Sequence, residues 1–119
     1  MRPRILSVSY DETLLRTRES LLESQGYSVR SAEGFTDALK YCNAGDYDLV
    51  VMGHSIPHRD KQALFDAIRR SCDAPVLALL RVNEPSLPGA AASIDPMEIK
   101  TFLETVRTLT KGEGAGSAA

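Results

Sequence analysis

Apolar residues gather in four short runs along the chain, at residues 4–9, 27–31, 48–52 and 75–80. The run over 48–52 is the most apolar of the four and ends directly before Gly53. Short runs of this composition are typical of strands that are buried on both faces of a parallel sheet. We therefore predict four strands, with residues 48–52 forming the central one.

The segments between these runs repeat apolar residues at the spacing of a helix. Asp11 can cap a first helix that ends at Gly26, and charged residues such as Arg18 are expected on its wet side. Residues 34–43 predict a second helix, and Asp60 can cap a third. The helical and strand spacings together predict these core positions: Leu14, Leu21, Val50, Leu64, Ile68, Val76, Leu77, Phe102, Leu103 and Val106.

Residues 81–93 interrupt this alternation. They contain Pro85 and Pro88 and carry no helical stripe of apolar residues, so we expect a loop there, followed by a short fifth strand over 90–93. A last helix is expected to open at Asp95 and Pro96, because aspartate is a favourable cap and proline suits the first helical position.

The order of these elements predicts the fold class. Strands separated by single helices pair in parallel through right-handed crossovers, which gives an open α/β sheet with helices on both faces. In such sheets the functional groups gather beyond the carboxyl ends of the strands. The candidate positions are therefore residues 9–11, 53–55 and 80–81, with the segment before Ile94.

Composition and charge narrow the class of protein. The chain has 119 residues, of which 43% are hydrophobic, and this suffices for one domain, which we expect over 1–110. Residues 111–119 are rich in Gly, Ala and Ser and predict a disordered tail. Fourteen Lys and Arg against sixteen Asp and Glu give a net charge of −2, which argues against a nucleic acid partner. No apolar run approaches the roughly 20 residues of a membrane span, so we expect no membrane contact and a cytoplasmic protein. Cys42 and Cys72 are expected to be free thiols.

Several of these segments, taken together, resemble a known family. Their joint spacing is similar to that of the receiver domain of two-component response regulators, the CheY-like proteins, over residues 5–109. The resemblance implies a flavodoxin-like, doubly wound parallel sheet of five strands in the order 2-1-3-4-5, here with the fourth helix missing or replaced by a loop. The segments that carry it are residues 5–11 (ILSVSYD), 22–29 (LESQGYSV), 37–39 (DAL), 47–52 (YDLVVM) with Ile56, Pro57 and Asp60, 74–79 (APVLAL) and 94–96 (IDP).

The reaction of that family needs particular side chains. Phosphoryl transfer from a histidine kinase to an aspartate requires two acids that hold a divalent metal, the carboxylate nucleophile, a hydroxyl and a lysine. The resemblance places these roles, in that order, on Ser9 and Tyr10, Gly53, Leu80 and Ala92. These positions and Asp11 form a degenerate pocket. The resemblance therefore implies a pseudo-receiver that lacks the phosphoacceptor and needs no metal or cofactor.

Nearby side chains offer substitutes for the missing groups. Asp11 is the one acid left near the first strand end, but a single carboxylate binds magnesium poorly without a phosphate ligand. His54 and Ser55 follow Gly53 and are candidate acceptors, although a histidine in such a loop is more often bonded to backbone or water.

Two other kinds of site, a hydrolase triad and a flavin site, are alternatives to this interpretation. Ser9, His54 and Asp11 are the residue types of a hydrolase triad, but the chain lacks the nucleophile elbow that such a triad needs. The hydroxyls of Ser7, Ser9 and Thr13 suggest a flavin phosphate site. Against it, the first loop has no glycine and the chain has no Trp to stack on a flavin.

The expected function is therefore a non-enzymatic interaction module in two-component signalling that works without phosphorylation. Tyr10 is expected to fill the space above Gly53, with ligand stacking as the alternative role of its ring, and Arg81 adds a cation to the rim. The alternative function is a small-ligand or cofactor-binding protein that uses this emptied site. A true receiver with an unrecognised acceptor is a third hypothesis.

The missing fourth helix also predicts an interaction surface. Its loss leaves apolar surface near Leu79 and Val82, which is either patched by the loop through Leu87 or buried by another chain. With Arg81, these residues form the expected surface for a partner protein or for a second copy in a homodimer.

Overall fold

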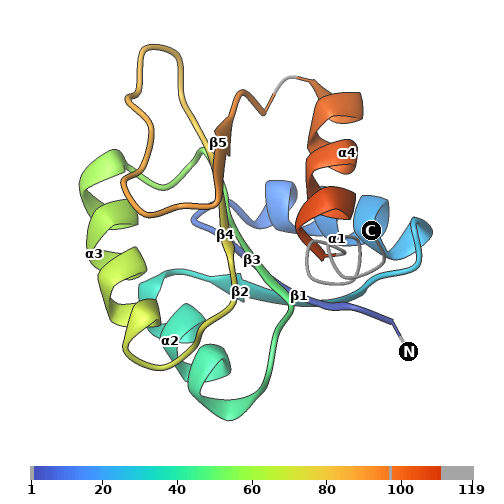
Figure 1. The fold of residues 1–119 in the computed structure, drawn as a ribbon, viewed down its shortest axis with the longest axis horizontal. Helices are drawn as coiled ribbons and strands as arrows, with labels where there is room; N and C mark the ends of the chain where they lie inside the picture. Colours follow the sequence, from blue (N-terminus) through green and yellow to red (C-terminus); the bar gives the residue numbers. More distant parts are fainter. Residues whose placement is uncertain (1, 97, 111–119) are drawn as a thin grey trace, which may run out of the picture.

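The computed structural model describes residues 2–96 and 98–110 and has a five-stranded parallel sheet at its centre (Figure 1). The strand order is β2-β1-β3-β4-β5, as the resemblance to receiver domains implied. The expected tail over 111–119 lies outside the described residues. The strands are β1 (Arg4–Ser9), β2 (Ser28–Glu33), β3 (Leu49–Met52), β4 (Val76–Leu79) and β5 (Ala92–Ile94).

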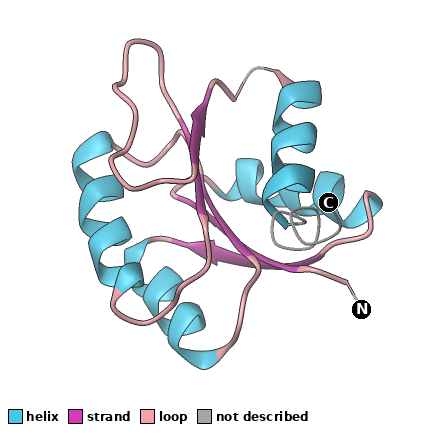
Figure 2. Cartoon of the chain, viewed as in Figure 1, coloured by secondary structure: helices cyan, strands magenta, loops and turns pink. Residues whose placement is uncertain are grey.

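Helices cover both faces of the sheet, so the molecule has three layers (Figure 2). The helices are α1 (Glu12–Ser24), α2 (Phe35–Ala44), α3 (His58–Arg69) and α4 (Ile99–Thr110). Helices α2 and α3 pack on one face and α1 and α4 on the other (Figure 1). None of these helices has the length and hydropathy needed to cross a membrane.

The helix starts agree with the sequence at α1 and differ at α3 and α4. Asp11 caps α1, because its carboxylate accepts a hydrogen bond of 3.1 Å from the Leu14 N–H. Helix α3 begins after Pro57, so Asp60 lies in its first turn and the expected cap at Asp60 is wrong. Pro96 lies in a turn before α4 rather than at its first position, and α4 begins only at Ile99, so the expected helix start at Asp95 and Pro96 is wrong.

Two apolar clusters fill the spaces between the sheet and the helices. Seven of the ten expected core residues are buried, namely Val50, Leu64, Ile68, Val76, Leu77, Phe102 and Val106. Leu21 and Leu103 are only partly buried, because they flank the second cluster instead of entering it. Leu14 is also partly buried and lines a cavity between α1 and α4.

A loop connects β4 to β5 where the related fold would have a helix, as expected, and β5 starts at Ala92. The loop packs on the α3 side of the sheet through Leu87, which is 3% exposed. Gly89 has φ +86°, and a Cβ there would stand 2.7 Å from the Phe65 ring. Only glycine allows this close approach of the loop to α3.

This packing changes the expected interaction surface. Leu79 is 1% exposed because it belongs to the cluster beneath α4, and Leu87 is buried against α3. Neither leucine is available to a partner in this conformation. Arg81 and Val82 remain exposed, and Val82 exposes 90% of its surface.

Candidate functional site at the carboxyl ends of β1 and β3

Hydroxyl groups join the ends of β1 and β3. The Oγ atoms of Ser9 and Ser55 are 2.7 Å apart, and Ser55 Oγ also accepts a hydrogen bond of 3.0 Å from the Tyr10 N–H. Ser9 Oγ accepts a hydrogen bond of 3.0 Å from the Asp11 N–H. The two serines therefore bond to each other and to the backbone of the β1–α1 loop.

Tyr10 turns away from Gly53 and packs against the cluster beneath α2 and α3. Its hydroxyl donates a hydrogen bond of 3.1 Å to Asp60 Oδ2 in the first turn of α3. Burial, together with the hydrogen bond and charge of Asp60, raises the pKa of Tyr10. The ring thus joins the β1–α1 loop to α3, and the prediction that it fills the space above Gly53 is wrong.

Arg18 fills that space instead. A Cβ at position 53 would stand 2.7 Å from Arg18 Nη1 and 3.1 Å from the carbonyl oxygen of Val8. The sequence placed Arg18 on the wet side of α1, yet it is 8% exposed. It shares the buried stripe of α1 with Leu15 and Leu22, at helical spacings of three and four. That spacing is the sequence signal that could have identified it.

His54 is the one polar partner of this guanidinium in the described residues. Arg18 Nη2 lies 3.0 Å from His54 Nδ1, so the imidazole accepts the hydrogen bond as a neutral ring. Burial lowers the pKa of His54, and the charges of Arg18, Lys61 and Arg81 lower it further. Burial also lowers the pKa of Arg18, against the opposing charge of Asp11.

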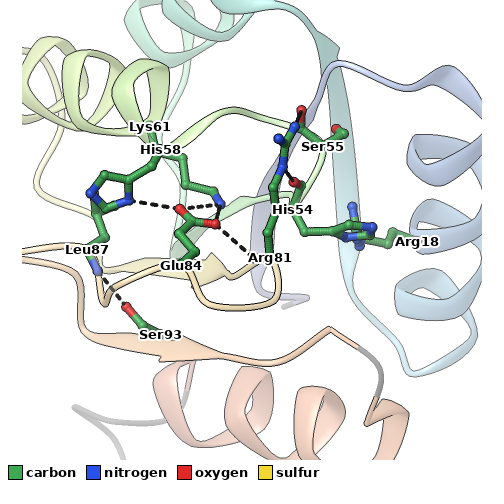
Figure 3. A network of polar contacts seen from close by, with 9 residues as sticks. All are labelled: Arg18, His54, Ser55, His58, Lys61, Arg81, Glu84, Leu87 and Ser93. Atoms are coloured by element: carbon green, nitrogen blue, oxygen red, sulfur yellow. Dashed lines mark hydrogen bonds and ion pairs between the residues drawn. The ribbon is translucent and has the colours of Figure 1, made fainter.

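Arg81 is held at the rim by backbone carbonyls. Its Nε donates to the His54 oxygen and its Nη2 to the Ser55 oxygen, each at 2.8 Å (Figure 3). The guanidinium thus fixes the β3–α3 loop against the segment after β4. It brings a positive charge to this end of the sheet.

A buried ion pair beside this site was not foreseen from the sequence (Figure 3). Lys61 is fully buried, and its Nζ donates to both carboxylate oxygens of Glu84 at 2.7 and 2.9 Å. His58 Nδ1 lies 2.9 Å from Glu84 Oε2, and the Arg81 N–H donates to Oε1 at 2.8 Å. Burial alone raises the pKa of Glu84, but these hydrogen bonds outweigh it, so its pKa is lowered.

Leu80 and Ala92 complete the comparison with the expected pocket. Leu80 directly follows β4 and packs against the α3 side. Ala92 is the first residue of β5 and pairs with Leu77, so it lies at the amino end of that strand and its placement in the pocket is wrong. The residue that directly follows β5 is Asp95.

In the part of the chain that the structure describes, no three His, Cys, Asp or Glu side chains gather as a metal site.

The two cysteines are free thiols, as expected, and lie outside this site. Cys42 lies on α2 and is buried in the apolar cluster under that helix. Burial, with a hydrogen bond to Cys72, raises the pKa of its thiol to about 12. A thiol with so high a pKa is a poor nucleophile near neutral pH.

Comparison with known proteins agrees with the fold. No family model matches the chain. The transcriptional regulatory protein DltR of Streptococcus agalactiae is 27% identical over 116 residues, which cover 91% of this chain and 52% of DltR, so the chain spans about half the length of this relative. The receiver domain of the hybrid histidine kinase CckA is 26% identical with a TM-score of 0.75, covering 90% of this chain and 98% of that domain.

A third neighbour comes from the complex of the histidine kinase ThkA with the response regulator TrrA. It is 24% identical with a TM-score of 0.77 and covers 92% of this chain and 98% of its own. The fold is that of CheY-like receiver domains, to which this chain is similar in the order of its strands and in the arrangement of its elements.

Proposed function

We propose that this chain is a receiver domain of two-component signalling that works without phosphorylation, as a non-enzymatic module for binding a partner protein. The observation that carries the proposal is the guanidinium of Arg18 above Gly53. A cation in that place repels a divalent metal and fills the volume that an aspartate side chain and its phosphoryl group would need.

The hydrogen bonds around the site support the same proposal. Ser9 and Ser55 bond to each other and to the β1–α1 backbone, while Tyr10 bonds to Asp60. The hydroxyl groups of Ser9, Ser55 and Tyr10 therefore already have hydrogen-bond partners within the fold. A phosphoryl switch depends on groups that are free to rearrange around the phosphate.

The partner surface we propose is the exposed part of the β4–β5 loop around Val82. Arg81 fixes this loop to the β3–α3 loop and Glu84 fixes it to α3, so Val82 is presented on a firmly held backbone. A histidine kinase is bound by the structural neighbour TrrA, and a protein of two-component signalling is the class of partner that we propose here.

Magnesium with beryllofluoride, which mimics a phosphoryl group, tests the proposal. We expect the amide resonances of Ser9, Tyr10 and Gly53 to be unchanged by either reagent, and a bound partner protein to keep the same Kd. A canonical receiver serves as the positive control for the reagents. Saturable shifts at these three amides would contradict the proposal.

A further inference from the structure

A cavity of about 310 Å³ opens between α1 and α4, near the carboxyl ends of the strands. Its walls are apolar and include Leu14 and Leu21 from α1, Leu79 from β4, and Ile99 and Phe102 from α4. Ile99 is 59% exposed, so the cavity opens to solvent along α4. A space of this size and composition suits a small organic ligand with an apolar body.

One end of the cavity is positively charged. Arg18 and His54 line it, and in the described residues Arg18 Nη1 has no hydrogen-bond partner although the side chain is more than nine-tenths buried. Nη2 donates to the neutral imidazole of His54, and no carboxylate in residues 2–96 and 98–110 lies within ion-pair distance of this guanidinium, although the charge of Asp11 acts on it. A buried cation without an anionic group in contact is unfavourable, and an anionic ligand would supply one.

We propose that this cavity binds a small monocarboxylate with an apolar body, with its carboxylate against Arg18 and its body between Leu14, Leu21 and Phe102. The volume accommodates about ten non-hydrogen atoms, at about 30 Å³ for each water-sized group. One guanidinium matches the charge of one carboxylate and bonds to its two oxygens. The apolar walls disfavour inorganic phosphate, whose remaining oxygens would lose their water.

This inference shares Arg18 with the proposed function but makes a different claim, since ligand binding in the cavity needs no metal and no group on Gly53. Either proposal can therefore fail without the other.

Titration with octanoate, followed by amide resonances and calorimetry, tests this inference. We expect octanoate to shift the amides that line the cavity and to bind more tightly than octanol or octylamine, which share its chain. Arg18→Met should weaken octanoate by about tenfold or more, the range for a charge-assisted hydrogen bond, and leave octanol unchanged. Arg16→Met is the matched control, because Arg16 lies on the same helix and is exposed.

A second pair of variants keeps the test valid if Arg18→Met does not fold. Ile99→Glu places a negative charge at the exposed rim of the cavity and should weaken octanoate, whereas Thr101→Glu adds the same charge to an exposed position of α4 outside the cavity lining. Equal binding of octanoate and octanol would overturn the inference. Preference for inorganic phosphate over octanoate, or equal effects of the two glutamates, would overturn it as well.

Discussion

Arg18 and Gly53 depend on each other. The guanidinium lies above β3 where residue 53 has no side chain, and a Cβ there would approach Nη1 to 2.7 Å and force the guanidinium to shift. The guanidinium brings a positive charge to the point of the sheet where the resemblance to receivers implies a carboxylate. At the scale of single residues, this change of charge determines which ions the site can hold.

Gly53→Ala tests this dependence. We expect the added methyl group to lower the free energy of unfolding by about 1 to 3 kcal/mol, as overpacking usually does. The cost should be smaller when Arg18→Ala is already present, because the closest contact is then gone. Urea unfolding of the two single variants and the double variant measures the coupling. Strictly additive costs would show that the two residues do not share this space.

His54 gives a pH dependence with a definite sign. Its folded pKa lies below the ordinary 6.5, so the unfolded chain takes up a proton first as the pH falls. The free energy of unfolding should therefore decrease as the pH falls below 6.5 toward the folded pKa. His54→Gln, which retains an acceptor for Arg18, should lose this dependence. Urea unfolding across the range measures it, and equal slopes for both proteins would contradict the assignment of a neutral His54.

At the scale of elements, the loop between β4 and β5 takes the place of a helix by a different kind of packing. Leu87 and the close approach of Gly89 to Phe65 supply its apolar contacts with α3. Glu84 adds polar contacts with Lys61 that are shielded from water. A helix would satisfy its own backbone, whereas this loop relies on side chains from α3 for its position.

Glu84→Gln tests how far the loop depends on that contact. Because the charge of Lys61 would remain buried without its partner, we expect the free energy of unfolding to fall by about 3 to 5 kcal/mol. The folded pKa of Glu84 is lowered, so its contribution is complete above pH 4.5 and is lost as the pH falls through the folded pKa. The difference between wild type and variant should therefore narrow in acid.

Glu12→Gln is the matched control for that measurement. Glu12 also pairs with an arginine, Arg16, but both side chains are largely exposed, and exposed pairs contribute little. Similar losses of stability in the two variants would show that burial does not determine the effect of the Glu84 pair.

The sequence predicted the elements better than the side chains that enter the site. The parallel α/β sheet followed from the alternation of apolar runs and helical stripes, which is a property of many residues together, and its strand order followed from the resemblance to receiver domains. Arg18 was missed because a charged residue on a buried stripe was assigned to water, and Lys61 was not singled out at all. Each stands at helical spacing from buried leucines. Ala92 was misplaced because the short β5 gave no pattern to fix its register.

At the scale of the whole molecule, the arrangement of the β4–β5 loop bears on self-association. Leu79 and Leu87 are buried within one chain, which leaves Val82 as the exposed apolar side chain of the expected surface. One valine buries far less area than the roughly 1,200 Å² of a stable protein interface. We therefore expect sedimentation of a monomer at high concentration and no change with Val82→Glu. A dimer that Val82→Glu dissociates would contradict this expectation.

The central claim is that the site cannot accept a phosphoryl group, and intact mass after treatment with acetyl phosphate and magnesium tests it most directly. We expect the wild-type mass to be unchanged while a canonical receiver in the same tube gains one phosphoryl group. Gly53→Asp alone should also stay unmodified, because its carboxylate would pair with Arg18 and no acids at Ser9 and Tyr10 would hold the metal. A wild-type chain that gains a phosphoryl mass would contradict the claim.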